Sequence, residues 1–127
     1  MANMSLLPGK KIDPMLSAVC WNEKYVTGGL SGSVYLWNGN TATPSQGHKK
    51  KVDCFAVDSS GNLFSGDAEG RILSWKLTGG KIVCDKEVFN ASQIDKLDPG
   101  ILSIDFSPNK KMLICTNSSS IYEISGK

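Results

Sequence analysis

The sequence lacks the features that mark several common classes of protein. It has a single histidine, a net charge of only +2 and no apolar run longer than four residues. A balance so close to neutral gives no argument for a nucleic-acid partner. Apolar runs this short do not fit a signal peptide or a membrane-spanning helix, because both need longer stretches.

Cysteine is also sparse, and its placement excludes some chemistry. Cys20, Cys54, Cys84 and Cys115 stand alone, each inside or beside a strand-like apolar run. No two of them are close enough in sequence to form a metal knuckle or a redox pair. We therefore expect no metal and no cofactor, and buried, reduced thiols that pack as small hydrophobic groups. Reduced thiols favour a cytoplasmic protein.

What the sequence does contain is a set of short apolar runs separated by glycine-rich turns. Between Gly47 and Lys76, three such runs are opened by a Gly-His pair and closed by Trp75. Two strands, a tight hairpin and a strand that ends in tryptophan make up the layout typical of one propeller blade.

Similar units flank this stretch on both sides. Residues 27–37 match residues 65–75 at a distance of 38 positions, with tryptophan on tryptophan. A weaker copy ends at Ile124, which stands in place of the tryptophan. A period of about 40 residues predicts an all-β fold built from β-propeller blades. On these motifs, residues 15–124 resemble the WD-repeat family.

The repeat divides the chain into three blades. A propeller ring usually needs four or more blades. We therefore expect self-association, in the simplest case a two-copy ring of six blades, or completion by further blades. In the connection between the second and third blades, Asn90 could cap a single helical turn. The expected units are an N-terminal segment at 1–14 that could supply a closing strand, blade 1 at 15–46, blade 2 at 47–86, an inter-blade loop at 87–100, and blade 3 at 101–127 without its outer strand.

The resemblance to WD repeats implies a structural hydrogen-bonded set inside blade 2. Matched residue by residue, the set comprises His48, Ser65, Trp75 and, at the position usually held by aspartate, Glu69. Blade 1 keeps Thr27 and Trp37 of the corresponding set. A buried indole N–H needs an acceptor, and a hydroxyl can accept from it while donating to an imidazole. A carboxylate can then fix the other ring nitrogen.

Serine, histidine and a carboxylate are also the parts of a hydrolase triad. A catalytic serine must be exposed on a strained elbow, whereas Ser65 follows Leu63 and Phe64 inside a strand-like run. Blade 1 has Ser31 at the carboxylate position and no histidine before its inner strand. We therefore interpret His48 as structural and expect no catalytic residues.

A run of lysines precedes the inner strand of blade 2. Lys49, Lys50 and Lys51 follow His48 directly, and Lys110 and Lys111 lie in another loop and could add to the same patch. The functional interpretation is a basic patch that binds an acidic partner. The alternative is a solvated loop, which is what most short charge runs are.

Two stretches narrow the resemblance further. Residues 25–39 and 107–124 are similar to the echinoderm microtubule-associated protein-like family, whose blades can end in Gly-Thr-x-x-Gly-Glu-Ile-x-Glu-hydrophobic. Of that pattern, Thr116, Ile121, Glu123 and Ile124 match, while Cys115 and Ser119 replace the glycines and Ser120 replaces the first glutamate. The resemblance implies a non-catalytic scaffold that binds tubulin or microtubules, located in the cytoplasm or on the cytoskeleton.

Two alternatives stand beside this interpretation. The chain could be an adaptor subunit of another multiprotein complex, which would use the same kind of surface for a different partner. In a different class, some propellers are enzymes whose metal ligands or charged residues converge on the central channel. With one histidine and carboxylates scattered along the sequence, the chain has few residues that could form such a site.

Overall fold

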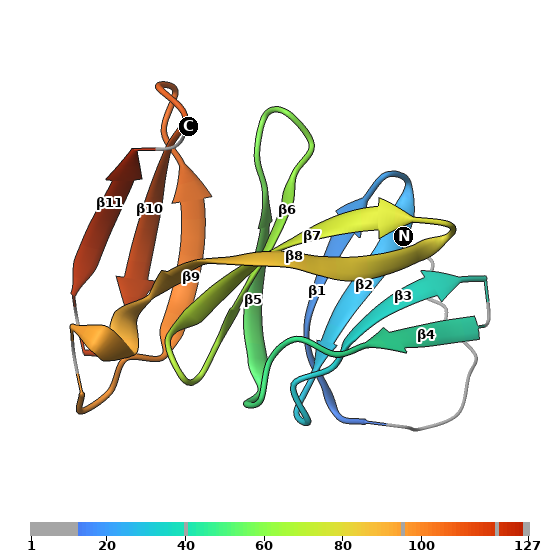
Figure 1. Cartoon of the computed structure of the whole chain (residues 1–127), viewed down its shortest axis with the longest axis horizontal. Coiled ribbons are helices and arrows are strands. Elements are labelled where there is room, and N and C mark those ends of the chain that lie inside the picture. The colour runs from blue at the N-terminus through green and yellow to red at the C-terminus, as the bar shows by residue number, and fades with distance from the viewer. Residues whose placement is uncertain (1–12, 40, 95, 119, 126–127) are drawn as a thin grey trace, which may run out of the picture.

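The computed structural model describes residues 13–39, 41–94, 96–118 and 120–125 (Figure 1). In this part of the chain the secondary structure is almost entirely β, with one 3₁₀ turn between the second and third sheets. The strands form three antiparallel sheets that lie side by side as blades. The all-β, propeller-type fold expected from the repeat is confirmed. The expected closing strand at the N-terminus falls on residues outside the described ranges.

Each sheet begins with its innermost strand and proceeds outward by hairpins. Blade 1 has the order β1 (Met15–Trp21), β2 (Lys24–Gly29), β3 (Val34–Asn38) and β4 (Thr41–Ser45). Blade 2 has the order β5 (Val52–Val57), β6 (Leu63–Asp67), β7 (Arg71–Thr78) and β8 (Lys81–Asn90). Blade 3 consists, in the described residues, of β9 (Ile101–Phe106), β10 (Lys111–Thr116) and β11 (Ile121–Ser125).

The outer strand of blade 2 is longer than the sequence predicts. The expected inter-blade loop at 87–100 is wrong at its start, because β8 continues through residues 87–90. Phe89 pairs with Ile72 of β7, and its ring packs on Tyr122 of blade 3 with 5.1 Å between centroids. This cross-blade contact keeps the segment in the sheet. The helical turn is confirmed as η1 (Ala91–Gln93), capped by the Asn90 side chain, which accepts from the backbone N–H of Ser92.

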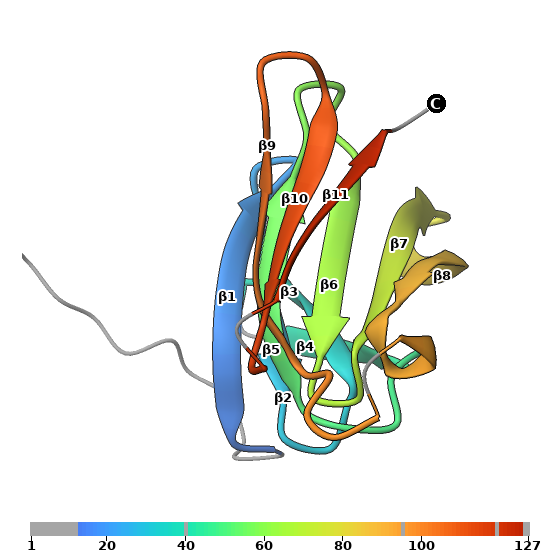
Figure 2. The same ribbon diagram turned by 90° about the vertical axis from the view of Figure 1, so that its left-hand side faces the viewer.

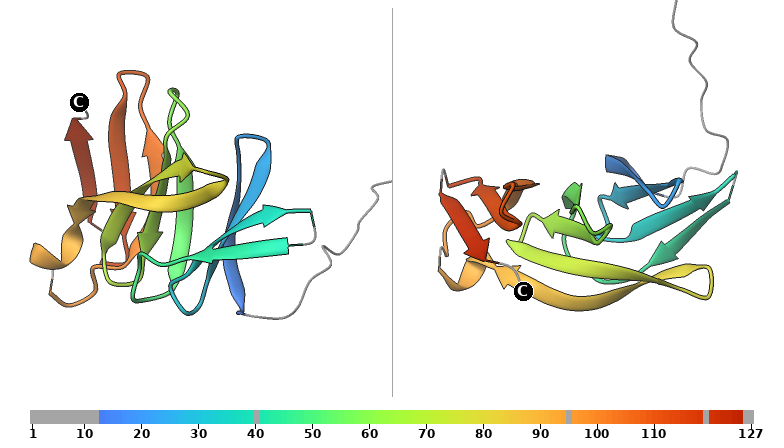
Figure 3. Two further views of the ribbon diagram at one scale, coloured as in Figure 1. Left: turned by 45° about the vertical axis from the view of Figure 1, so that its right-hand side comes forward. Right: turned by 90° about the horizontal axis from the view of Figure 1, so that it is seen from above.

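The innermost strands lie next to one another and the outer strands diverge. β5 contacts both β1 and β9, and β8 also reaches β4 of blade 1. Figure 2 shows β1 and β9 on one side of the molecule and the β7–β8 hairpin on the other. Figure 3 shows the hairpin sweeping from blade 2 toward blade 1. The three blades therefore form an arc in which blade 2 has a neighbour on each side.

The hydrophobic core is divided between the two junctions of this arc. Val26, Val34 and Leu36 of blade 1 pack against Leu63, Leu73 and Trp75 of blade 2 in one cluster. A second cluster joins blade 2 to blade 3 and contains Ile72, Ala91, Ile101, Ile104, Met112 and Ile114. A fully buried aliphatic side chain contributes about 1.5–3 kcal/mol. Packing between blades, rather than within one sheet, is therefore the main source of stability.

The expectation that all four thiols are buried is wrong for two of them. Cys20 and Cys84 are exposed, whereas Cys54 and Cys115 are half-buried. Cys20 lies on the face of β1 that points away from blade 2, and Cys84 lies on the outermost strand of its sheet. Thus an apolar run predicts a strand but not which of its faces is covered. In the described residues no helix is long and apolar enough to cross a membrane.

Candidate functional site

A buried polar cluster lies in blade 2, on the side of that blade that packs against blade 1. His48 precedes β5, Ser65 and Asp67 lie on β6, and Trp75 lies on β7. The imidazole Nδ1 is 2.6 Å from a carboxylate oxygen of Asp67, and Nε2 is 2.5 Å from the Ser65 hydroxyl. The Trp75 indole donates to the same hydroxyl over 2.7 Å. All four residues are buried.

The donors and acceptors of this cluster fit a single arrangement. Because the indole can only donate, the Ser65 oxygen accepts from it and the hydroxyl hydrogen is left for Nε2 of His48. The imidazole then carries its own hydrogen on Nδ1 and donates it to Asp67. The other carboxylate oxygen of Asp67 accepts the backbone N–H groups of Glu69 and Arg71, each over 2.9 Å. The cluster is thus closed on every side by protein groups.

The carboxylate of the set is Asp67, and the assignment to Glu69 is wrong. Glu69 lies in the β6–β7 hairpin and contributes only its backbone N–H, which donates to Asp67. Asp67 pairs with Val52 at the end of β6, where a short carboxylate side chain reaches the imidazole directly. Glu69 was assigned because it occupies the position of the family's aspartate. Asp67, two residues earlier in the sequence, is the carboxylate that binds His48.

The geometry of Ser65 is structural rather than catalytic. Its side chain is fully buried, and its oxygen is already used by Trp75 and His48. A nucleophile must reach a substrate and leave its lone pairs available for attack. Among the described residues no group of three or more histidine, cysteine or acidic side chains is placed to hold a metal ion.

Blade 1 has a corresponding tryptophan and a corresponding carboxylate, but different residues supply the partners. The Trp37 indole donates to Thr27 over 2.9 Å, as Trp75 does to Ser65. At the position of Asp67, blade 1 has Gly29, and a Cβ added there would overlap the carboxylate of Asp13. Asp13 accepts from the backbone and hydroxyl of Ser31 and from the Tyr35 hydroxyl. In blade 1 the carboxylate is therefore supplied by the segment before β1, whereas in blade 2 it is supplied by Asp67 on β6.

These contacts perturb both partners in blade 1. Burial acts to raise the pKa of Asp13, but the hydrogen bonds from Ser31 and Tyr35 outweigh it and hold that pKa below its usual range. Burial, and then the Asp13 carboxylate, raise the pKa of Tyr35. Blade 3 has no such cluster at these positions: Ile114 stands in the place of Ser65 and Ile124 in that of Trp75. Both isoleucines belong to the apolar contact with blade 2.

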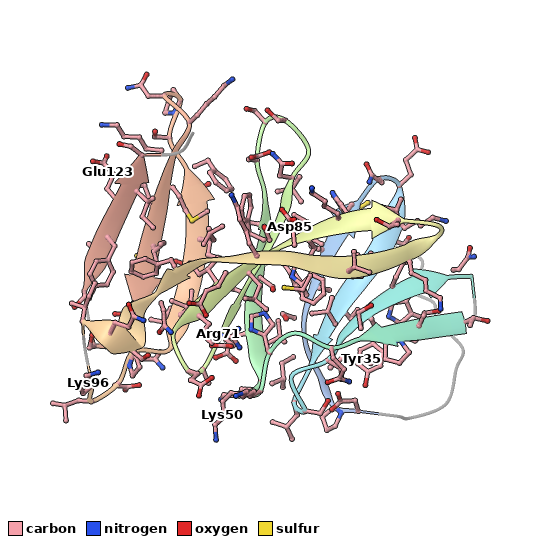
Figure 4. All side chains as sticks on the ribbon, viewed as in Figure 1. Tyr35, Lys50, Arg71, Asp85, Lys96 and Glu123 are labelled. Carbon is pink, nitrogen blue, oxygen red and sulfur yellow. The ribbon has the colours of Figure 1, made fainter. Side chains whose placement is uncertain are left out.

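The hairpins and the loops that lead into the blades form one continuous edge of the molecule, which we call the hairpin rim. At the β2–β3 hairpin, Gly32 lies against the backbone of His48 and Lys50, and at the β6–β7 hairpin Gly70 lies against Pro99. Asn117 of the β10–β11 hairpin donates to Asp98. Figure 4 shows Lys50, Arg71 and Lys96 toward this lower edge. A partner can therefore touch several blades at once along this rim.

Lysines and apolar tips are exposed together on the hairpin rim. Lys49, Lys50 and Lys51 are all exposed in the loop before β5. The β2–β3 hairpin and the loop before β9 add the exposed apolar side chains of Leu30, Ile94 and Leu97. Lysines and apolar side chains are thus both exposed on loops of this rim.

The second pair of lysines lies elsewhere, so the expectation of one combined patch is wrong. Lys110 and Lys111 lie in the β9–β10 turn, at the end of the inner strand, whereas residues 49–51 lie before the start of one. Because β5 and β9 run side by side in the same direction, the two groups are at opposite edges (Figure 1). Lys111 pairs with Glu123 at 3.8 Å. A hollow of about 320 Å³ separates this turn from the β5–β6 turn, with Asp58 and Lys110 among its lining residues.

The class of protein follows from this fold and this set of contacts together. A sequence model of the family described as "WD domain, G-beta repeat" matches residues 41–76, which include the whole His48–Ser65–Asp67–Trp75 cluster. The molecule has a WD40 propeller-like fold, and the chain is a WD40-repeat domain protein. Proteins of this fold generally serve as interaction scaffolds.

Two curated proteins are similar in sequence. The small ribosomal subunit protein RACK1y of Oryza sativa subsp. japonica is 33% identical over 102 residues, which cover 76% of this chain and 27% of that protein. The pre-rRNA-processing protein IPI3 of Yarrowia lipolytica (strain CLIB 122 / E 150) is 35% identical over 63 residues, which cover 49% of this chain and 15% of that protein. The chain thus spans only about a quarter or less of these relatives. Neither of them is named as a microtubule-associated protein.

Solved structures agree on the fold. The WD40 β-propeller domain of Doa1 superimposes with a TM-score of 0.65 at 14% identity, covering 82% of this chain and 33% of that one. The computationally designed Ika4 protein superimposes with a TM-score of 0.57 at 11% identity, covering 96% of this chain and 100% of that one. At such low identities the likeness concerns the fold alone.

Proposed function

We propose that this chain is a non-catalytic protein-interaction module that binds an acidic partner through its hairpin rim. The observation that carries the proposal is the joint exposure of Lys49, Lys50 and Lys51 with apolar tips on an edge that spans all three blades. The one Ser-His-Asp set of the described residues is buried and fully hydrogen-bonded, which supports the non-catalytic part.

The lysines and the exposed apolar side chains of the hairpin rim would contribute to binding in different ways. Exposed lysines attract an acidic surface over a distance of about 8 Å at physiological ionic strength, and that attraction weakens with added salt. The exposed apolar side chains contribute to binding only on direct contact, because only then is their surface removed from water. A partner that uses both should lose part of its affinity, but not all of it, at high salt.

Two partners are worth testing in the same assay. The resemblance of residues 25–39 and 107–124 to microtubule-associated propellers supports tubulin, and with it a cytoskeletal location. The similarity to a small ribosomal subunit protein supports an adaptor role on a ribosomal particle instead. We rank the ribosomal particle first, since a relative similar in sequence is named as a small ribosomal subunit protein.

The test is co-sedimentation of the purified chain with small ribosomal subunits and, separately, with stabilised microtubules, over a series of salt concentrations. The binding variant is K49E/K50E, and the matched control is K110E/K111E on the opposite edge, which changes the net charge by the same amount. We expect K49E/K50E to weaken pelleting at least as strongly as added salt does, and the control to pellet like the parent chain.

The outcomes separate the candidates. Pelleting with one particle only, lost in K49E/K50E, identifies the partner and supports the rim. Equal loss in both variants would mean that net charge alone matters, and would contradict a rim site. Pelleting with neither particle would remove both named partners while leaving the fold and the buried cluster untouched.

A further inference from the structure

A hollow lies on the edge of the molecule opposite the hairpin rim, at the junction of blades 2 and 3. The β5–β6 turn and the β9–β10 turn enclose it, and both turns project at the top of Figure 1. Its volume is about 320 Å³. Ligand pockets range from about 300 to 1,000 Å³, so this hollow has room for one or two side chains of a partner. Its lining includes Asp58, Ser59 and Ser60 of one turn and Phe106, Pro108 and Lys110 of the other.

Hydrogen bonds within the β5–β6 turn fix the carboxylate of Asp58 and keep it ionised. One of its oxygens accepts from the backbone N–H groups of Ser60 and Asn62, over 3.0 and 2.8 Å. The other oxygen accepts from the Asn62 side chain over 3.0 Å. Burial acts to raise the pKa of Asp58, but these hydrogen bonds outweigh it and hold that pKa below its usual range. The Trp21 indole of blade 1 donates to the carbonyl of Gly61 over 2.8 Å, which holds the turn in place from the other side.

The β9–β10 turn contributes a cation of its own. Within the described residues Lys110 forms no ion pair, whereas its neighbour Lys111 pairs with Glu123. The backbone of Lys110 has a φ of 64°, in the left-handed region that residues with side chains rarely adopt. Its N–H donates to the carbonyl of Ser107 over 2.9 Å, which closes the turn. Two opposite charges, on Asp58 and Lys110, therefore line the hollow from two well-defined turns without pairing with each other.

Apolar groups complete the lining. The Phe106 ring is half-buried and packs on Phe64 of blade 2, with 5.5 Å between ring centroids, and Pro108 follows it in the turn. An aromatic ring attracts cations. Arginine suits such a place better than lysine, because its planar guanidinium can stack on a ring while it donates to a carboxylate. Arginine is thus the side chain whose chemistry fits both Asp58 and Phe106.

We infer that this hollow binds an extended segment of a partner protein that presents an arginine and, two residues further along, a glutamate. The arginine donates to Asp58 and stacks on Phe106, and the glutamate pairs with Lys110. Side chains two residues apart lie on the same face of an extended segment, about 7 Å from each other, so both can enter one hollow. The inference does not rest on the function proposed for the hairpin rim, and a particle held by the rim does not use this hollow.

The experiment titrates the isotope-labelled chain with the peptide acetyl-Gly-Arg-Gly-Glu-Gly-amide and follows the backbone amides by NMR. We expect chemical-shift changes in residues 58–62 and 106–111, and none in residues 30–32 and 49–51 of the hairpin rim. Two matched peptides replace either the arginine or the glutamate by glutamine. Loss of the arginine should weaken binding about tenfold or more, because hydrogen bonds between charged groups are the strong ones. Loss of the glutamate should weaken it about two- to fivefold, since an exposed lysine forms weaker ion pairs.

Variants of the chain separate this site from general charge attraction. Asp58→Asn keeps an acceptor for the backbone of its turn and should raise the Kd about tenfold. The matched control is Asp105→Asn, which removes an exposed carboxylate of the neighbouring strand β9 and should leave the Kd unchanged. Lys110→Glu should reverse the second preference, so that this variant binds acetyl-Gly-Arg-Gly-Lys-Gly-amide more tightly than the parent chain does.

Several results would overturn the inference. They are equal binding of the three peptides to the parent chain, shift changes spread over the whole surface, and no shift changes at millimolar peptide. An unchanged Kd in Asp58→Asn would overturn it as well, with the spectrum of the variant used to establish that it is folded. The glutamine peptides and Lys110→Glu test the two contacts even if Asp58→Asn disturbs its turn.

Discussion

A buried hydrogen-bonded cluster contributes more to stability than its size suggests, because each member is costly to leave unsatisfied. Asp67 accepts from His48 through one oxygen and from two backbone N–H groups through the other. Removing the carboxylate would leave three donors buried without an acceptor. Net hydrogen bonds contribute about 1 kcal/mol each, but an unsatisfied buried group costs about 1–3 kcal/mol.

The first prediction concerns this carboxylate. Asp67→Ala should lower the free energy of unfolding by about 2–3 kcal/mol or more, as measured by urea denaturation. Glu69→Ala serves as the matched control, since only its backbone takes part, and should change the free energy by less than about 0.5 kcal/mol. If the two variants unfolded at the same urea concentration, the assignment of Asp67 to the cluster would be refuted.

The second prediction exchanges the carboxylate of blade 1 between two positions. Asp13→Ala should lower the free energy of unfolding by about 1 kcal/mol, similar to loss of a capping residue. D13A/G29D should recover stability, because the nearest atoms to a Cβ at position 29 are those of the Asp13 carboxylate. G29D alone should destabilise, since two carboxylates would compete for one space. A double variant less stable than D13A would show that the two positions are not equivalent.

The same residue gives a pH dependence with a definite sign. The hydrogen bonds from Ser31 and Tyr35 hold the pKa of Asp13 below its usual range in the folded protein, so its ionised form stabilises the fold. This stability is present above the unfolded pKa and is lost as the pH falls from there through the lower folded pKa. Comparing urea midpoints of the parent chain and Asp13→Asn should therefore show a difference at neutral pH that shrinks in acid. A difference that grows on acidification would contradict the assignment.

Among strands, the covered face decides the chemistry of a side chain. Cys54 on β5 faces blade 3, and burial raises the pKa of its thiol to about 12. Cys20 on β1 faces away from blade 2 and is exposed. Because the thiolate is the reactive form, a buried thiol of high pKa reacts slowly.

The fourth prediction is an order of alkylation. With iodoacetamide at mildly alkaline pH, mass mapping of peptides should find Cys20 modified first and Cys54 last. Cys84 should react at an intermediate rate, since burial raises its pKa although its side chain is exposed. Unfolding in urea should remove the order, which serves as the control. Early modification of Cys54 in the folded protein would contradict its place in the interblade cluster.

At the level of elements, the sequence determined which runs become strands but not how far they extend or what covers them. Three runs per blade and the Gly-rich hairpins were readable because strand and turn residues alternate with a fixed period. The extension of β8 to Asn90 was not, since it depends on Phe89 meeting Tyr122 of the next blade. The role of Asp13 was equally hidden, because only the fold brings the segment before β1 to Gly29.

In the molecule as a whole, the candidate surface depends on strand direction, which the sequence does not display. Lys49–Lys51 and Lys110–Lys111 look alike in the sequence, yet an inner strand separates the rims on which they lie. The hydrogen-bonded set, by contrast, could be anticipated from the resemblance to WD repeats, except for its carboxylate. Local patterns thus predicted contacts within a blade better than the arrangement of its two edges.

Stability should be distributed unevenly along the arc, because repeat units are held mainly by their neighbours. Blade 2 belongs to both interblade clusters, whereas blades 1 and 3 each belong to one. Hydrogen exchange followed by mass spectrometry should therefore find the slowest amides in β5 and β6. The fastest among the strands should be in β4 and β11, which lie at the outer edges of their sheets in the described chain. Asp67→Ala should speed exchange in β5 and β6 more than in β10, because its cluster lies at the junction of blades 1 and 2. Equal protection in all three blades would mean instead that the arc opens as one cooperative unit, with no blade able to separate before the others.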